Sequence, residues 1–148
     1  MLKLENVSKF YYNKGIIASG FTKVNLELKI GEFVVITGES GSGKSTLLNV
    51  ISGLDSYEEG EMYANGNETS HFSEKDFEDY RRKYVANIFQ TFNLVNSYTV
   101  YQNIELVLLL NGYKKRKVKK KILDIIDQVG LTKFKNTKVS KLSGGQKQ

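Results

Sequence analysis

The sequence predicts an α/β fold, with strands in residues 1–90 and helices mainly after them. Apolar and polar residues alternate strictly from Val24 to Ile30, which is typical of a strand buried on one face. Phe33–Thr37 is a continuous apolar, β-branched run, as expected of a strand buried on both faces, and a glycine-rich loop follows it. After Thr99 the spacing of apolar residues changes to that of a helix.

Composition excludes several classes of protein. The chain has 148 residues, which suits one domain with a core of its own. It contains no cysteine, so a disulfide framework and a thiolate metal site are both excluded. The N-terminus lacks the apolar core of a signal peptide, and the apolar run Leu106–Leu110 is far too short to span a membrane. We therefore expect no direct insertion into a membrane.

Two further strands are expected in the first part of the chain. The apolar residues of Leu2–Val7 predict a first strand, and Gly31-Glu32 forms a turn before the buried apolar run. Glu61–Ala64 followed by Asn65-Gly66 predicts a short strand and a tight turn. These segments add to the alternating and buried strands described above.

Helices are predicted on both sides of the last strand of this part. The apolar residues Leu47, Leu48 and Ile51 mark one face of a helix that follows the glycine loop and ends at Gly53. Ser73-x-x-Asp76 has the form of a capping box, so a helix is expected from there to about residue 82. Residues 84–89 are then predicted to form another strand, which ends at Gln90.

The remaining residues predict a helical block. A first helix follows Thr99, and a second carries the apolar residues of Val118–Val129 and ends at Gly130. We find no internal repeat and no linker rich in proline or serine, so the block is interpreted as an insertion and not as a tethered domain. The apolar residues expected on one face of the first helix are Val100, Ile104, Val107 and Leu108.

A complete phosphate-binding loop separates the buried apolar run from the helix that follows. Gly38–Thr46 matches the pattern G-x-x-x-x-G-K-[ST]. Its glycines let backbone N–H groups turn toward phosphate oxygens, and the helix N-terminus adds the positive end of its dipole. Lys44 would supply a mobile charge to the β- and γ-phosphates, and the Ser45 hydroxyl would ligate Mg²⁺. The predicted binding residues are Gly38, Glu39, Ser40, Gly41, Ser42, Gly43, Lys44, Ser45 and Thr46.

The basic character of the chain comes from one short segment. Seven lysine and arginine residues lie within 114–121, and because the net charge of the chain is +6, the rest of it carries −1. A solvated helix face is the usual explanation for such a run, and attraction to the inner membrane leaflet is the alternative. Binding to single-stranded nucleic acid would need interleaved aromatic residues, and only Tyr113 lies nearby. We expect no nucleic-acid partner.

A second glycine motif, Leu142–Gln146, lies near the last residue of the chain. A serine followed by two glycines at a helix start offers a hydroxyl and bare N–H groups to an anion. Alone, this five-residue string would be a weak signal, but together with a phosphate-binding loop far upstream it is very specific. The pair resembles the ATPase subunits of ATP-binding cassette (ABC) transporters, and the resemblance extends over the whole chain.

The resemblance implies a fold and a branch of the family. It implies a P-loop NTPase core with an N-terminal antiparallel β segment in residues 1–90, and an inserted helical subdomain in residues 91–148. Together these form the N-terminal portion of one nucleotide-binding domain. The amino-acid sequences of Ile88–Leu94 and Gly53-Leu54-Asp55 most resemble those of the branch that releases lipoproteins and exports macrolides and antimicrobial peptides.

The resemblance also implies further site residues. Gln90 would contact Mg²⁺ and the attacking water, so Lys44 and Gln90 are the candidate catalytic residues. Val7–Tyr11 resembles the segment whose aromatic residue stacks on adenine, and a flat ring suits that task because stacking needs little directional hydrogen bonding. Spacing favours Tyr11 over Phe10 and Tyr12, and a tyrosine packed on the strand edge is the alternative.

Partners follow from the same resemblance. Two ATPase subunits would pair head to tail, with each ATP between the phosphate-binding loop of one and the Leu142–Gln146 motif of the other. Membrane permease subunits would take up the closing motion, which implies a cytoplasmic location on the inner face of the membrane. The residues expected to touch the partner's ATP are Ser143, Gly144, Gly145 and Gln146.

The resemblance is incomplete at the C-terminus. The chain stops at Gln148, so the family's Mg²⁺-supporting aspartate, general-base glutamate and switch histidine have no counterpart, and His71 is expected to be an exposed loop residue. Because phosphoryl transfer needs a positioned water and neutralised charge, we expect weak ATP binding and little or no hydrolysis by these residues alone. An open sheet edge and marginal stability are also expected. The alternative function is a catalytically inactive module that regulates an intact subunit or pairs with one.

Overall fold

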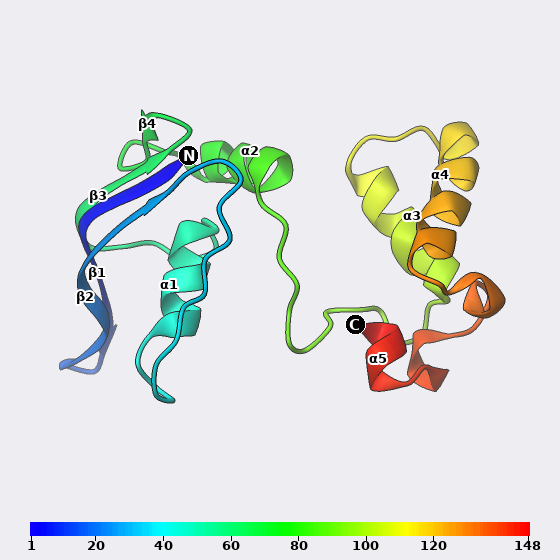
Figure 1. Cartoon of the computed structure of the whole chain (residues 1–148), viewed down its shortest axis with the longest axis horizontal. Helices are drawn as coiled ribbons and strands as arrows, with labels where there is room; N and C mark the ends of the chain where they lie inside the picture. The colour runs from blue at the N-terminus through cyan, green and yellow to red at the C-terminus, as the bar shows by residue number, and fades with distance from the viewer. The chain divides into compact units, whose positions relative to one another are not determined.

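The computed structural model describes all 148 residues and divides them into two compact units, Met1–Ala86 and Asn87–Gln148. The first unit contains a β-sheet and two helices, and the second contains only helices (Figure 1). The α/β fold with an N-terminal antiparallel β segment and a helical block is therefore confirmed.

The sheet of the first unit has four strands in the order β2-β1-β3-β4. Strand β1 (Leu2–Asn13) lies between β2 (Ile16–Leu28) and β3 (Glu59–Ala64), and the short β4 (Asn67–Glu68) continues from β3. Every pair is antiparallel, and Leu2 is opposite both Leu28 and Ala64. Three of the predicted strands, over 2–7, 24–30 and 61–64, are thus parts of this one sheet.

Local sequence explains the turns and the buried face of this sheet. Asn65 and Gly66 have φ values of 51° and 82°, as a two-residue hairpin turn requires, and they join β3 to β4. Val24, Leu26 and Leu28 are each half-buried, whereas the residues between them are exposed. The alternation therefore places one face of β2 against the core. Ile30 continues the pattern in sequence but lies beyond the strand and is 93% exposed.

The prediction of a buried strand over Phe33–Thr37 is wrong for this chain. No strand forms there, and Phe33 and Val35 are 92% and 66% exposed. A strand is defined by hydrogen bonds to a neighbour, and all four strands of the sheet belong to other segments. The apolar, β-branched composition is thus present without the pairing that would bury it.

The strand expected over residues 84–89 is also absent. Tyr84 is the last residue of helix α2 (Glu74–Tyr84), and Val85 adopts extended backbone after it. No other strand pairs with residues 85–89, and Ile88 is 84% exposed. As with Phe33–Thr37, composition favoured a strand but the chain supplies no partner for it.

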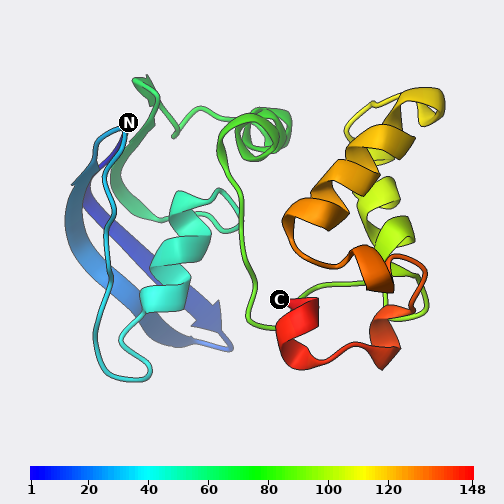
Figure 2. The ribbon, with the colours of Figure 1, turned by 45° about the vertical axis from the view of Figure 1, so that its right-hand side comes forward.

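Helix α1 (Lys44–Ile51) packs beside the sheet and completes the core of the first unit (Figure 2). Val50 is fully buried, and Leu47 and Ile51 pack against the same cluster. Leu48, which was expected on this face, is 49% exposed instead. The helix ends as predicted, since Gly53 has a φ of 68° just after it. The buried core residues of this unit are Leu4, Val7, Phe21, Val50 and Met62.

The capping box at the start of α2 is confirmed. The Asp76 N–H donates to the Ser73 side chain, and the Ser73 N–H donates to the Asp76 carboxylate at 2.9 Å. Two N–H groups that the helix leaves unpaired are therefore satisfied by side chains.

The second unit is built from α3 (Val100–Leu110) and α4 (Lys115–Gln128), followed by short helical turns. These are η1 (Thr132–Phe134), η2 (Val139–Lys141) and α5 (Gly144–Lys147). Val107 is 57% exposed, so only part of the predicted apolar face of α3 is buried. The buried cluster consists of Val100, Leu108, Val118, Ile122, Ile126, Val139 and Leu142. None of the chain's helices combines the length and the apolar character needed to span a membrane.

Replacing Ile122 by alanine is expected to destabilise the helical unit by about 2–5 kcal/mol, because a fully buried side chain would leave a cavity. Urea unfolding followed by circular dichroism measures the change. Lys120→Ala, an exposed position on the same helix, is the control and should change stability by less than about 0.5 kcal/mol. Equal effects of the two substitutions would show that α4 does not pack as described.

Candidate nucleotide-binding site

The phosphate-binding loop owes its course to backbone that only glycine adopts easily. Gly41 and Gly43 have φ values of 85° and 87°, in the left-handed region. Gly43 is the N-cap of α1 and has no side chain to cap it, so the loop leads directly into the first turn of the helix. The helix N-terminus therefore presents N–H groups and its positive dipole end beside the loop.

Gly43 also fixes the loop against the sheet. A Cβ atom on Gly43 would lie 2.0 Å from the carbonyl oxygen of Gly20, a residue of β2. A Cβ on Gly20 would in turn lie 2.8 Å from Cγ2 of Thr46. Gly43 thus allows a backbone approach that any side chain would block, and Gly20 leaves room for the Thr46 side chain. This contact places the loop, which leads into the N-terminus of α1, next to the β1–β2 hairpin.

The Lys44 ammonium is held by the loop. Its Nζ donates to the carbonyl oxygen of Gly38 at 2.9 Å, to that of Glu39, and to Oγ of Ser42 at 3.3 Å. The positive charge therefore lies against residues 38–42, where phosphate oxygens would bind. Ser45, the next residue, is exposed in the first turn of α1.

Tyr11 lies with the loop in one surface depression of about 380 Å³. Strand β1 contributes Tyr11, β2 contributes Ser19 and Gly20, and the loop and first turn of α1 contribute the rest of the lining. Phe10 and Tyr12, the alternatives for the adenine-stacking ring, are not among the lining residues. The structure therefore brings together Tyr11 and the loop residues Ser40, Gly41, Gly43, Lys44, Ser45 and Thr46.

Sequence reasoning missed a charged cluster beside Tyr11. Lys9 is only 4% exposed, and its Nζ lies 3.0 Å from Asp55 Oδ1 and 3.1 Å from Glu58 Oε1. The Tyr11 hydroxyl donates to Asp55 Oδ2 at 2.9 Å. The partners are far apart in the sequence, so no local pattern could have indicated the cluster, although a buried lysine needs carboxylate partners.

These contacts shift the ionisation of both partners. Burial by itself would lower the pKa of Lys9, but hydrogen bonds to Asp55 and Glu58 outweigh it and raise the pKa above its ordinary value. Burial would likewise raise the pKa of Asp55, but hydrogen bonds from Lys9 and Tyr11 lower it. Both groups are therefore held in their charged forms.

Gln90 belongs to the second unit and lies in an exposed turn. The residues after it, Phe92 and Asn93, have φ values of 62° and 49°, which is an uncommon conformation for residues with a side chain. The Phe92 N–H donates to the Phe89 carbonyl at 3.2 Å and closes the turn around Gln90. His71 of the first unit is exposed in a loop, as expected.

The motif at 142–146 forms the start of α5. The Gln146 N–H donates to Ser143 Oγ at 3.3 Å, and the Ser143 N–H donates to Gln146 Oε1 at 2.9 Å. Gly144 and Gly145 do not have positive φ, and a Cβ on either would meet nothing within 4 Å. Neither the backbone nor the packing of this chain therefore requires glycine at these two positions.

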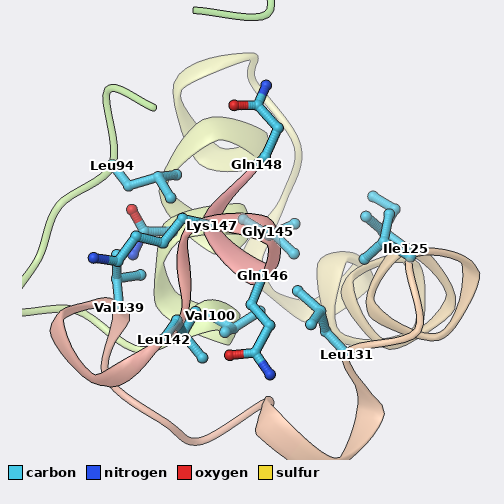
Figure 3. A pocket seen from close by; sticks show the side chains of 13 residues that line it. Leu94, Val100, Ile125, Leu131, Val139, Leu142, Gly145, Gln146, Lys147 and Gln148 are labelled. Carbon is cyan, nitrogen blue, oxygen red and sulfur yellow. The ribbon is translucent and has the colours of Figure 1, made fainter. Parts of the chain in front are cut away.

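The second unit also contains an apolar cavity of about 280 Å³ beside this motif (Figure 3). Gly145 and Gln146 border it, and Val100, Leu131 and Leu142 line it (Figure 3). Because the lining is mainly aliphatic, this cavity does not suit a triphosphate. The depression at the phosphate-binding loop does, since it offers an ammonium, backbone N–H groups and a hydroxyl.

The same loop residues suit Mg²⁺ as well as phosphate. Mg²⁺ is bound in nucleotide sites through one or two protein oxygens, several waters and the phosphates themselves. The exposed Ser45 hydroxyl beside Lys44 is such an oxygen. No group of three or more acidic, histidine or cysteine side chains gathers to hold a metal ion without a nucleotide.

Comparison with known proteins decides the family. Residues 21–148 match the family described as ABC transporter. The chain belongs to this family. A solved structure of the ATP-binding cassette MJ0796, a dimer in a post-hydrolysis state bound to ADP and Pi, is 38% identical, with a TM-score of 0.88. That likeness covers 99% of this chain and 65% of the cassette.

Relatives within the ABC family carry different transport names. The methionine import ATP-binding protein MetN of Clostridioides difficile is 39% identical over 148 residues, which is all of this chain and 44% of MetN. The lipoprotein-releasing system ATP-binding protein LolD of Treponema denticola is 38% identical over 128 residues, or 86% of this chain and 57% of LolD. The chain thus spans about half the length of these relatives.

Replacing Gly43 by alanine is expected to abolish measurable nucleotide binding, because the new Cβ would collide with the Gly20 carbonyl. Gly41→Ala is the matched control, since Gly41 has nearly the same φ but open space around its Cβ position. It should cost only the left-handed strain of about 1–2 kcal/mol. Titration with a fluorescent ATP analogue measures both. If the two substitutions weaken binding of the ATP analogue equally, the loss is caused by left-handed backbone strain and not by a collision with Gly20.

The Lys9–Asp55 contacts predict a pH-dependent stability. The lowered pKa of Asp55 adds stability above the carboxyl's unfolded pKa, and this is lost as the pH falls through the folded pKa. The raised pKa of Lys9 adds stability that is lost as the pH rises through its folded pKa, above 10.5. Unfolding of Asp55→Asn should therefore depend less steeply on pH below about 4 than unfolding of the unmodified chain. Asp124→Asn, an exposed position on α4, is the control.

Proposed function

We propose that the chain is the ATP-binding part of an ABC transporter and couples ATP binding and hydrolysis to export through membrane permease subunits. The observation that carries this proposal is the depression in which Tyr11, the glycine loop, Lys44 and Ser45 meet. Adenine would stack on Tyr11, the loop N–H groups and Lys44 would hold the phosphates, and Ser45 would ligate Mg²⁺. Bound Mg²⁺ would neutralise phosphate charge.

Gln90 and the motif at 142–146 are proposed to complete the site. Gln90 would contact Mg²⁺ and orient the attacking water. Ser143, Gly145 and Gln146 would contact ATP held by a second subunit in a head-to-tail dimer. Glycine costs about 1 kcal/mol relative to alanine within a helix, yet Gly144 and Gly145 meet nothing in their own chain. Close approach of another molecule gives a reason for them, and the related cassette MJ0796 is a dimer.

The role of the two parts of the chain is proposed on the same basis. Residues 1–90 would bind the nucleotide, and residues 91–148 would transmit the closing motion to permease subunits on the inner face of the cell membrane. Two observations support export: the amino-acid sequences of residues 88–94 and 53–55, and the relative named for lipoprotein release. Import is the competing direction, because other relatives are named for methionine import.

Replacing Lys44 by alanine is expected to weaken Mg²⁺-ATP binding at least tenfold, since a hydrogen bond to a charged group contributes about 1.5–3 kcal/mol. Isothermal titration calorimetry on the 148-residue chain measures the change. Lys75→Ala on α2, an exposed lysine of the same unit, is the control and should bind ATP normally. ATP affinity that is unchanged in Lys44→Ala would refute the proposed site.

An ATPase assay on the same proteins tests hydrolysis. We propose that residues 1–148 alone bind ATP but turn it over at close to the background rate, because phosphoryl transfer needs groups beyond the loop and Gln90 to position water. Mg²⁺-dependent turnover that disappears in Lys44→Ala would contradict this part of the proposal. It would also rule out a catalytically inactive regulatory module.

A further inference from the structure

Tyr11 is restrained by Lys9 and Asp55, two neighbours to which the sequence motifs assign no role. From these contacts we infer that Asp55 and Lys9 are positioning residues, which fix the Tyr11 ring in the orientation that stacks on the adenine base. The inference rests on the proposed function, because it takes the nucleotide site at the glycine loop as given. It adds roles for two residues outside the loop.

Two contacts restrain the ring. The Tyr11 hydroxyl donates to Asp55 Oδ2 at 2.9 Å. The Lys9 ammonium lies over the ring, 5.0 Å from its centroid, within the range of a cation–π interaction. Gly20 leaves room for the ring, since a Cβ at this residue would lie 3.2 Å from Tyr11 Cε2. Tyr11 remains 42% exposed despite these contacts, so part of the ring is open to a ligand.

The carboxylate of Asp55 links two partners that would otherwise be independent. Its Oδ1 accepts from the Ser56 N–H at 2.9 Å and lies 3.0 Å from Lys9 Nζ, while its Oδ2 accepts from Tyr11. The side chain of Asp55 is 28% exposed, so these bonds are partly shielded from water. The Asp55 carboxylate is thus oriented by the charged Lys9 and by the neutral Ser56 N–H and Tyr11 hydroxyl. Its Oδ2 atom, which accepts from Tyr11, is therefore held in a fixed direction.

Lys9 is fully occupied within this cluster. Its ammonium reaches Asp55, Glu58 Oε1 at 3.1 Å and Ser56 Oγ at 3.2 Å, which accounts for all three of its donors. Glu58 Oε2 also accepts from the Phe10 N–H at 2.7 Å, so the segment after α1 is bound to the backbone of β1 next to Tyr11. Lys9 is not among the residues that line the depression at the phosphate-binding loop, whereas Lys44 is. The role of Lys9 is therefore to hold the carboxylates and the ring.

The cluster connects the two ends of the nucleotide site. Helix α1 has the phosphate-binding loop at its N-terminus, and Asp55 follows its C-terminus, where the Asp55 N–H donates to the Asn49 carbonyl. A helix of this length is rigid, so it sets the spacing between the loop and the carboxylate that holds Tyr11. The ring is thereby ordered before the base arrives, and less side-chain entropy is lost on binding.

Two probes separate positioning of the ring from general stability. Mg²⁺-ATP uses the ring and the loop, whereas Mg²⁺-tripolyphosphate uses the loop alone. Calorimetry on the 148-residue chain should show that Tyr11→Phe and Asp55→Ala each weaken ATP binding about three- to tenfold and leave tripolyphosphate binding unchanged. The double variant should bind ATP as tightly as the single variant that has the lower ATP affinity, because both substitutions remove the same hydrogen bond.

Matched controls sharpen the comparison. Tyr113 in the second unit also lies under a lysine, with the Lys121 ammonium 4.3 Å from its ring centroid and donating to its hydroxyl. Tyr113→Phe should therefore change binding of neither probe. Asp55→Asn keeps an oxygen acceptor for the Tyr11 hydroxyl, so its ATP affinity should lie between that of Asp55→Ala and that of the unmodified chain.

Several results would overturn the inference. If Asp55→Ala weakens both probes equally, Asp55 serves stability alone. If Tyr11→Ala weakens ATP binding but Tyr11→Phe and Asp55→Ala do not, the ring stacks without being positioned, and the proposed function stands. If the unmodified chain binds neither probe, or if Lys44→Ala changes neither affinity, the proposed function fails and the inference fails with it.

Discussion

The contact between Gly43 and Gly20 fixes the position of the phosphate-binding loop, and the rest of the candidate site is arranged around it. The Gly20 carbonyl oxygen of β2 would lie 2.0 Å from a Cβ on Gly43, so the loop can approach the sheet this closely only because residue 43 is glycine. The contact anchors the start of α1 at the β1–β2 hairpin. From that point the helix runs with its N-terminus at the loop and its buried face toward the core.

The same helix connects the glycine loop to the residues around Tyr11. Its C-terminal end leads into Gly53 and then Asp55, which holds the hydroxyl of Tyr11. Strand β1 and the turn after the helix are thus joined through the buried Lys9 ammonium and its carboxylate partners. Because a buried ammonium is costly without partners, the cluster also makes the packing of β1 against this turn specific.

Two apolar segments need residues from elsewhere to bury their side chains. Phe33–Thr37 and residues 85–89 have the composition of buried strands, but each lacks a neighbour and exposes large apolar side chains. Exposed apolar surface of this kind is usually covered in the functional state. In the same way, Gly144 and Gly145 have space around them that their own chain does not fill.

The sequence by itself determined the local features of this protein: the glycine loop and the helix after it, the capping box at Ser73, and the turn at Asn65-Gly66. Each depends on residues close together in the chain, and the family resemblance rested on such motifs. Only the tertiary structure decided which apolar runs become strands, since a strand needs a partner that composition does not supply. It also brought Lys9 and Asp55 to Tyr11, because an ion pair between residues distant in sequence leaves no periodic pattern to read.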